Sequence, residues 1–195
     1  MSDAPASWSK LTDDLERVLY TREQIQTRVN ELGAMIAADY ANRSPMVIGI
    51  LKGAVMFFAD LTRAIPASIS IDFIATSSYG SNDVTSGVVR ILKDLDRPID
   101  DRHVLLVEDI VDSGLTLSYL VRMLRARHPA SIRIAALLDK PSRRKTPLQA
   151  DYIGFSIDDL FVVGYGLDFD QRYRNLPMIG VLKPACYQKL GGEES

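Results

Sequence analysis

The chain has 195 residues, 47% of them hydrophobic, which is enough to form one compact domain with a buried core. Its formal net charge of −2 argues against a broad basic surface for nucleic acid. A single cysteine, Cys186, excludes an internal disulfide and fits a reducing compartment, and two histidines argue against a Cys/His zinc site.

The N-terminal stretch MSDAPASW lacks the basic start and the apolar core of a signal peptide. No apolar run approaches the roughly 18 residues that are needed to cross a bilayer. We therefore expect a cytoplasmic protein with no membrane partner, in which residues 1–13 form a flexible leader.

The first predicted helix covers about residues 22–41. Thr21 and Gln24 have the spacing of a capping box, and apolar residues then recur at helical spacing. These are Ile25, Val29, Leu32, Ile36 and Tyr40. The apolar run 46–51 predicts a buried strand, which a second helix follows. The predicted core face of that helix consists of Ala54, Phe58, Leu61 and Ile65.

The later part of the chain predicts several more strands. They lie at 69–76, 88–93, 132–138, 152–157, 161–164 and 179–182, and one more begins at Val104. The helix after this last strand faces the core with Leu117, Leu120, Val121 and Leu124. Strands that alternate with helices, several of them continuously apolar, predict an α/β fold with a parallel sheet covered on both faces. Ligands of such folds bind beyond the carboxyl ends of the strands.

The stretch VLLVEDIVDSGLTL, residues 104–117, carries the strongest site signal. Its last part leaves a strand and opens a helix, where unpaired N–H groups and a partial positive charge favour a phosphate. Gly114 lets the backbone approach a ligand, and Ser113 and Thr116 add hydroxyl donors. Glu108 and Asp109, one turn upstream, suit the hydroxyls of a ribose.

The simpler interpretation of the same turn is an ordinary strand-to-helix connection, with Asp112 or Ser113 as the helix N-cap. The preceding acid pair favours the phosphoribosyl site instead. A Walker A loop is absent from the sequence, and no G-x-G-x-x-G dinucleotide fingerprint follows a strand.

This stretch closely resembles the phosphoribosyl-pyrophosphate signature of the type I phosphoribosyltransferases. Four further segments resemble the bacterial hypoxanthine (hypoxanthine-guanine) phosphoribosyltransferases. They are LKGAVMFFADL (51–61), SSYG (77–80), LLDKPSRR (137–144) and FVVGYGLDFDQRYRNLP (161–177). The resemblance covers about residues 15–184. It implies a single type I phosphoribosyltransferase domain over 1–195, with a central parallel sheet flanked by helices. A small hood would come from the N-terminal helix and the C-terminal segment.

The resemblance implies purine salvage, in which the 5-phosphoribosyl group moves from phosphoribosyl pyrophosphate to hypoxanthine or guanine. The products would be IMP or GMP and pyrophosphate. Asp112 would be the catalytic residue, near the purine N7, and Ser113, Gly114, Leu115 and Thr116 would bind the 5′-phosphate. Leu115 fills a variable slot in which some relatives carry lysine, so this loop would depend more on backbone donors and hydroxyls.

The resemblance also implies a Mg²⁺ cofactor, whose hard oxygen shell suits carboxylates, water and diphosphate. The carboxylates near this metal would be those of Glu108, Asp109 and Asp168. Lys52 and Gly53 would contact pyrophosphate, in a loop that often holds a non-proline cis peptide bond, here between Leu51 and Lys52. From its position in the sequence alone, Lys52 fits a solvent-exposed lysine at the end of a strand as well as it fits a pyrophosphate contact.

The remaining site residues implied by the resemblance contact the purine or the leaving group. Lys140 would donate to the 6-oxo group of the purine, Phe161 would stack on its ring, and the backbone of Val162 would read its edge. Arg174 would contact pyrophosphate. By composition alone, Lys140 would be a surface lysine and Phe161 a core aromatic. The basic residues Arg143, Arg144 and Lys145 are expected to form a solvated turn.

The polar stretch 77–87 joins two strands and is longer than a hairpin requires, so we expect a mobile lid. Within it, Ser78 and Tyr79 match the family's closing-loop dipeptide.

Four consecutive apolar residues, 55–58, predict a subunit interface in a homodimer or homotetramer. Two alternatives stay open. One is a xanthine-preferring or pyrimidine phosphoribosyltransferase. The other is a nucleotide-sensing regulator that binds RNA or DNA, which the acidic charge balance disfavours.

Overall fold

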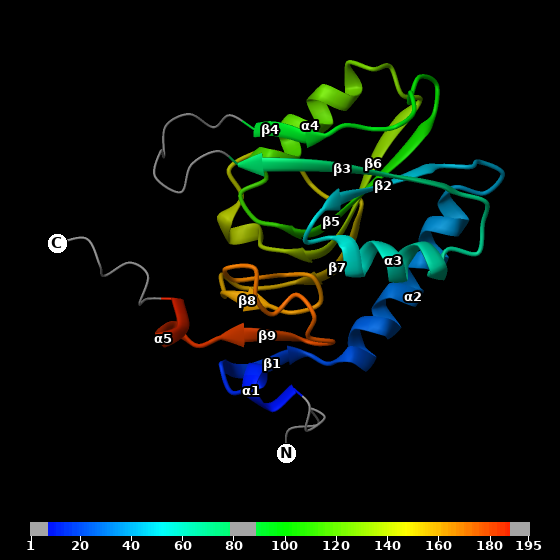
Figure 1. The fold of residues 1–195 in the computed structure, drawn as a ribbon. Coiled ribbons are helices and arrows are strands. Elements are labelled where there is room, and N and C mark those ends of the chain that lie inside the picture. Colours follow the sequence, from blue (N-terminus) through cyan, green and yellow to red (C-terminus); the bar gives the residue numbers. More distant parts are fainter. Residues whose placement is uncertain (1–7, 79–88, 188–195) are drawn as a thin grey trace. The chain divides into compact units, whose positions relative to one another are not determined.

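The computed structural model describes residues 8–78 and 89–187. The chain divides into two compact units, whose elements Figure 1 labels. Residues 28–159 form the first, here called the large unit, and the two ends of the chain, 1–27 and 160–195, form the small unit.

A six-stranded sheet with the strand order β4-β3-β2-β5-β6-β7 forms the large unit. Its strands are β2 (Met46–Leu51), β3 (Ser70–Ser78), β4 (Val89–Lys93), β5 (His103–Val111), β6 (Ser131–Asp139) and β7 (Tyr152–Ser156). Neighbouring strands are parallel, except that β4 pairs with β3 in the antiparallel direction. The predicted α/β fold with a mostly parallel sheet is confirmed.

Helices cover both faces of this sheet, as the continuously apolar strands predict. In α4 (Leu115–Arg125), the four predicted core residues are all buried, and they pack with Ile48 and Ile50 of β2 in one core cluster. Val47 and Gly49 point to the opposite face because side chains alternate along a strand. There the ring of Phe58 in α3 (Val55–Ala64) lies so close that a Cβ on Gly49 would approach it to 2.8 Å.

The first predicted helix is α2, Arg22–Asp39, which ends two residues before the predicted boundary. All five of its predicted core residues are buried. The capping box is confirmed, because Thr21 N donates to Gln24 Oε1 at 2.8 Å and Gln24 N donates to Thr21 Oγ1 at 3.3 Å. Among the helices of residues 8–78 and 89–187, none is long and apolar enough to cross a membrane.

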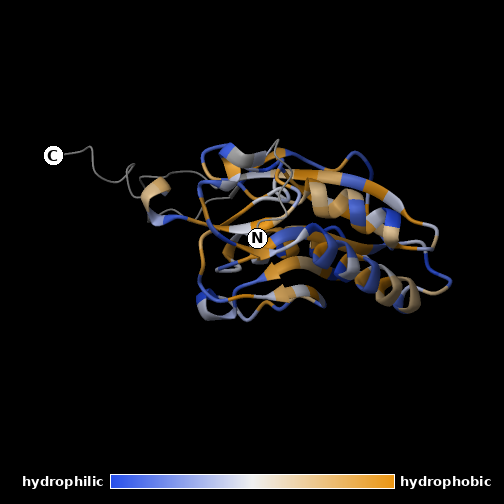
Figure 2. Ribbon diagram, turned by 90° about the horizontal axis from the view of Figure 1, so that it is seen from below, coloured by the Kyte–Doolittle hydropathy of each residue, from blue (hydrophilic) through white to orange (hydrophobic). Residues whose placement is uncertain are grey.

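The small unit contains a separate antiparallel sheet with the order β1-β9-β8. Its elements are α1 (Ser9–Thr12), β1 (Leu15–Tyr20), β8 (Val162–Val163), β9 (Ile179–Leu182) and α5 (Pro184–Tyr187). The strands predicted at 161–164 and 179–182 therefore exist, but their expected place in the parallel sheet is wrong. Figure 2 shows hydrophobic residues along the strands and mixed faces on the helices.

Strand β1 has no counterpart among the predicted elements. Only Leu15 of its six residues is buried, and its pairing with β9 has two irregularities, so the sequence lacks the alternation of a half-buried strand. Helix α1 lies in the segment that was expected to be a leader. Trp8 and Leu11 from this segment pack against a core cluster that contains Leu15, Tyr173 and Leu182.

Candidate active site

Most of the predicted site residues of the large unit lie at the carboxyl ends of β2, β5 and β6. These three strands are neighbours in the sheet, so their terminal loops lie side by side. Lys52 and Gly53 follow β2, the Glu108–Thr116 stretch ends β5 and opens α4, and Lys140 follows β6. The expected cis peptide bond between Leu51 and Lys52 is present.

The acid pair lies against the loop after β2. A Cβ on Gly53 would lie 1.7 Å from Oδ2 of Asp109, so a larger residue there would displace this carboxylate. The pKa of Glu108 is raised well above its usual value, because its carboxyl is buried, faces the charge of Asp109 and is hydrogen bonded to it. The pair places two carboxyl groups side by side near the carboxyl end of β5.

The phosphate turn has the backbone that the sequence predicts. Gly114, and not Asp112 or Ser113, is the N-cap of α4, with φ = 77°, a left-handed conformation that favours glycine. Ser113 lies one residue earlier, and its Oγ accepts a long hydrogen bond of 3.4 Å from the N–H of Leu115. The N-terminal turn of α4 still carries N–H groups and a partial positive charge that favour an anion. Thr116 is partly buried, and the Leu115 side chain is 53% exposed.

The segment 139–145 folds back onto this turn. The backbone N–H of Lys145 donates to the carbonyl of Ser113 at 2.9 Å. Arg144 donates to the carbonyl of Asp112 at 2.8 Å and forms a largely buried ion pair with Asp139. Arg143 Nε lies 2.8 Å from Asp112 Oδ1. The expectation of a solvated basic turn is wrong for Arg144, whose side chain is largely buried against Asp139. Arg143 and Lys145 are exposed as expected, although Arg143 also pairs with Asp112.

Lys140 is buried, with 7% of its surface exposed, which excludes an ordinary surface lysine. Its backbone N–H donates to the carbonyl of Val111 at 3.0 Å and thereby ties the ends of β6 and β5 together. Its ammonium lies 3.7 Å from Oδ1 of Asp159, a residue that the sequence analysis did not assign to the site. The ammonium is therefore a fixed donor at the strand ends.

In the small unit, Phe161 is 39% exposed rather than a core aromatic. Its ring stacks on Tyr187 with a centroid distance of 4.7 Å and meets Phe169 edge to face at 5.6 Å. Val162 is buried in β8 and pairs with Val181 of β9. The exposed ring is suited to stacking on a planar ligand.

Asp168 and Arg174 face each other across a tight turn of the small unit, with Arg174 Nη2 2.7 Å from Asp168 Oδ1. Asp168 also accepts a hydrogen bond from the backbone of Gln171, and Arg174 donates to the carbonyl of Gly166. The enclosed Nε of Arg174 has no hydrogen-bond partner among the described residues.

The same turn is held by a second set of contacts. Tyr173 donates to Asp14 Oδ2 at 2.6 Å, and Arg172 forms an ion pair with the same carboxylate at 3.4 Å. Burial and the charge of Asp14 raise the pKa of Tyr173 to about 12. These residues shape the turn that carries Asp168 and Arg174.

Two predictions concern the chain between β3 and β4. Ser78 is the last residue of β3. Tyr79 and the rest of the predicted lid up to residue 87 lie outside the described residues.

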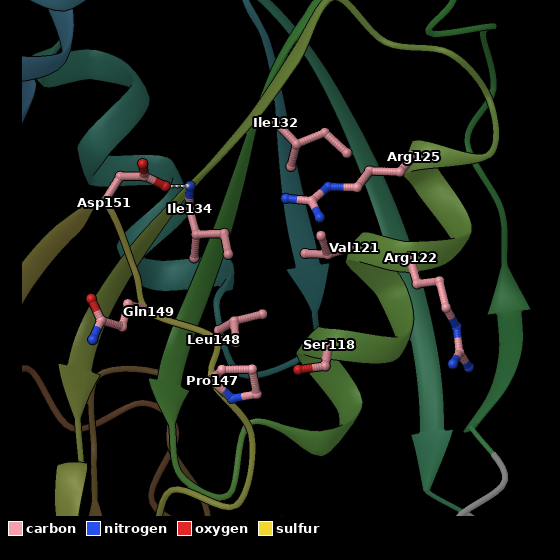
Figure 3. A pocket seen from close by; sticks show the side chains of 10 residues that line it. All are labelled: Ser118, Val121, Arg122, Arg125, Ile132, Ile134, Pro147, Leu148, Gln149 and Asp151. Carbon is pink, nitrogen blue, oxygen red and sulfur yellow. Dashed lines mark hydrogen bonds between the residues drawn. The ribbon is translucent and has the colours of Figure 1, made fainter.

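A cavity of about 580 Å³ lies elsewhere in the large unit, between α4 and the segment 147–151 (Figure 3). Arg122 and Arg125 of α4 line one side, and Leu148 and Asp151 line the other. Asp151 accepts a hydrogen bond from the backbone of Ile134 at 2.8 Å. The lining includes none of the site residues predicted from the sequence.

Comparisons with known proteins decide the family. A family model described as a phosphoribosyl transferase domain matches residues 19–170. The chain is also 54% identical over 175 residues to the hypoxanthine-guanine phosphoribosyltransferase of Bacillus subtilis, with 90% of this chain and 97% of that protein covered. The chain belongs to the hypoxanthine-guanine phosphoribosyltransferases.

Solved structures from this family have the same fold. A crystal structure of a hypoxanthine phosphoribosyltransferase from Staphylococcus aureus has a TM-score of 0.88 and 46% identity, over 91% of this chain and 97% of that one. A hypoxanthine phosphoribosyltransferase from Trypanosoma cruzi, studied for the role of its C-terminal region in oligomeric state and enzymatic activity, has a TM-score of 0.87. It is 43% identical, over 92% of this chain and 97% of that one. The resemblance seen in the sequence motifs is confirmed.

Proposed function

We propose that this protein transfers the 5-phosphoribosyl group from phosphoribosyl pyrophosphate to hypoxanthine or guanine, in purine salvage. The observation that carries the proposal is the grouping at the carboxyl ends of β2, β5 and β6. There the acid pair Glu108–Asp109, the N-terminal turn of α4 and the buried ammonium of Lys140 lie at the ends of neighbouring strands. These groups suit a ribose, a phosphate and a 6-oxopurine, respectively.

The reaction forms a bond between N9 of the purine and C1′ of the ribose, while the bond from C1′ to the pyrophosphate oxygen breaks. The purine loses its N7 proton, which Asp112 accepts. Glu108 and Asp109 accept hydrogen bonds from the ribose hydroxyls and stabilise the positive charge that develops on the sugar ring. The first turn of α4, with Ser113, Gly114, Leu115 and Thr116, holds the 5′-phosphate through backbone and hydroxyl donors.

Three residues are assigned to recognition of the base. Lys140 donates to the 6-oxo group, Phe161 stacks on the ring, and the backbone of Val162 reads the ring edge. The chain forms a single phosphoribosyltransferase domain, with a hood from the N-terminal helix and the C-terminal segment. Ser78 and Tyr79 belong to a lid that excludes water from the sugar cation.

The leaving group requires cationic partners. Lys52 and Gly53 contact the pyrophosphate after β2, and Arg174 contacts it with the exposed part of its guanidinium, since 23% of its side chain is exposed. Glu108, Asp109 and Asp168 supply the carboxylate oxygens that suit Mg²⁺, which commonly binds through one or two carboxylates and substrate phosphates. Within residues 8–78 and 89–187, no three His, Cys, Asp or Glu side chains are grouped closely enough to hold a metal ion. Substrate phosphates would therefore have to complete the coordination. Bound Mg²⁺ would neutralise the charge of the diphosphate.

We further propose a homodimer or homotetramer in the cytoplasm. In α3, Phe57 is buried within the chain, but Met56 is 39% exposed and Val55 is partly exposed, so an apolar strip remains. Sedimentation that shows only a 21.7 kDa species at micromolar concentration would contradict the proposed assembly.

One assay tests the function. Phosphoribosyl pyrophosphate and Mg²⁺ are supplied with hypoxanthine, guanine, xanthine, adenine or uracil in separate reactions, and mononucleotide formation is measured. We expect turnover with hypoxanthine and guanine. Turnover confined to xanthine or to uracil would instead support the alternative enzymes, and absence of turnover together with salt-dependent RNA retention would support a regulator.

A further inference from the structure

Four charged side chains of the large unit form a row with alternating sign. Arg143 Nη1 lies 3.2 and 3.1 Å from the two carboxylate oxygens of Asp159, and Arg143 Nε lies 2.8 Å from Asp112 Oδ1. The Asp159 carboxylate lies 3.7 Å from the ammonium of Lys140. The row therefore runs from Lys140 through Asp159 and Arg143 to Asp112. We call its two middle residues the Arg143–Asp159 bridge.

The ends of this row match one edge of a 6-oxopurine. The 6-oxo group accepts a hydrogen bond, and the neighbouring N7–H of the free base donates one. Lys140 is a donor and Asp112 is an acceptor, so the two side chains together have the complementary pattern. Reading both atoms at once requires a defined spacing between the ammonium and the carboxylate.

The backbones at both ends of the row are already held. Lys140 N donates to the carbonyl of Val111, and Arg144 donates to the carbonyl of Asp112. What remains to be positioned is the charged end of each side chain, and the bridge contacts both ends. Asp112 Oδ1 is enclosed and lies 2.8 Å from Arg143 Nε, while 42% of the Asp112 side chain remains exposed. Arg143 therefore holds one carboxylate oxygen, and the exposed part of the carboxylate can accept a hydrogen bond from an N–H of the base.

The bridge itself contributes little to folding. Arg143 and Asp159 each have 51% of the side chain exposed, and ion pairs at such positions are usually weak. Nearby charges from Asp112 and Asp159 raise the pKa of Arg143, which keeps it protonated. A role limited to fold stability would therefore leave variants of the bridge close to wild type in every assay.

We propose that Arg143 and Asp159 are positioning residues that hold Lys140 and Asp112 at the spacing of the O6 and N7 atoms of the purine. The proposal rests on the proposed function. It assigns to the bridge no contact with the phosphate or the ribose, so substitutions should alter the use of the base and not the binding of phosphoribosyl pyrophosphate.

Single variants test the roles of Asp159 and Arg143 one at a time. Asp159→Asn removes the counter-charge of Lys140 and should raise KM for hypoxanthine and guanine about tenfold. Arg143→Gln leaves Asp112 without its guanidinium and should lower kcat about tenfold. Arg143→Lys should restore only part of this loss, because one ammonium cannot contact two carboxylates as a guanidinium fork does. In each variant, KM for phosphoribosyl pyrophosphate should stay within about twofold of wild type.

The matched controls are Asp158→Asn and Arg43→Gln, which remove one charge of the same sign at exposed positions. Both should retain wild-type kinetics, and thermal unfolding should show all variants folded. The decisive measurement is the double variant Asp159→Asn/Arg143→Gln. If the bridge acts as a unit, its loss in kcat/KM should approach that of the worse single variant.

Two results would overturn the proposal. One is a double variant whose loss in kcat/KM equals the product of the two single losses. The other is bridge variants whose kinetics equal those of the controls. Wild-type turnover with the five bases is measured first and tests the proposed function separately. A wild-type enzyme that uses hypoxanthine or guanine, with unaffected bridge variants, defeats this inference alone. A wild-type protein that uses neither base defeats both.

Discussion

The two units hold their site residues by different means. In the large unit, Glu108 and Asp109 lie in a strand that is paired on both sides, and Asp112 and Lys140 directly follow paired strands. In the small unit, Asp168 and Arg174 lie on a turn in which several residues have positive φ, among them Tyr165, Asp170, Gln171 and Tyr173. The sheet positions the first set, whereas irregular backbone and a few hydrogen bonds position the second.

This difference predicts how substitutions should act. Residues at sheet ends can lose their functional group while the backbone stays in place, so activity should fall and stability should not. Changes in the turn of the small unit should disturb the backbone first, so stability should fall along with activity.

The largest effect is expected at Asp112 in the large unit. Asp112→Asn removes the proton acceptor but keeps the backbone of the phosphate turn, so kcat should fall by roughly 10²–10⁴. Phosphoribosyl pyrophosphate should still bind, which calorimetry can measure, and the unfolding temperature should be unchanged. Wild-type turnover in this variant would remove Asp112 from its proposed role.

A backbone change in the small unit provides the contrast. Gly164 has φ = 100°, and a Cβ there would lie 2.1 Å from the carbonyl oxygen of Met178. Gly164→Ala should therefore reduce the free energy of unfolding by roughly 2–4 kcal/mol, through strain and steric clash. Chemical denaturation measures this change. Unaltered stability would contradict the view that the small unit depends on its backbone conformation.

A substitution of Lys140 tests whether different groups of the large unit bind the purine and phosphoribosyl pyrophosphate. Lys140→Ala removes the donor to the 6-oxo group and should raise KM for hypoxanthine and guanine about tenfold or more. KM for phosphoribosyl pyrophosphate should remain nearly constant, because the acid pair and the α4 turn are intact. Steady-state kinetics with each substrate varied in turn provides the test. A selective loss of phosphoribosyl pyrophosphate binding would assign Lys140 to the other substrate.

The smallest effect is expected at Tyr173, which anchors the turn of the small unit to Asp14. Tyr173→Phe removes this hydrogen bond and should cost about 1–2 kcal/mol of stability. The folded-state pKa of Tyr173 is about 12, above the ordinary value of about 10. The protonated Tyr173 hydroxyl thus stabilises the folded state fully below pH 10, and this stabilisation is lost as the pH rises through 12. Denaturation at several pH values should show a weaker alkaline loss in the variant than in wild type. An equal loss in both would assign the alkaline sensitivity to other groups.

Much of the large unit follows from the sequence, because its signals are local. The apolar run at 46–51 coincides with β2, and the predicted core residues of α2, α3 and α4 are all buried. The phosphate turn follows from the order of acids, glycine and hydroxyls between a strand and a helix. Such patterns depend on residues within one or two turns of each other, and the same residues carry the family resemblance.

Only the tertiary structure decided the small sheet and the charged bridge. Strand β1 pairs with β9, which lies at the other end of the chain, and one buried residue in β1 is too weak a signal to predict that pairing. A run such as Arg143-Arg144 has the same sequence pattern whether it is solvated or paired. Asp112 and Asp159 come from other parts of the chain, so only the fold could bring them to Arg143.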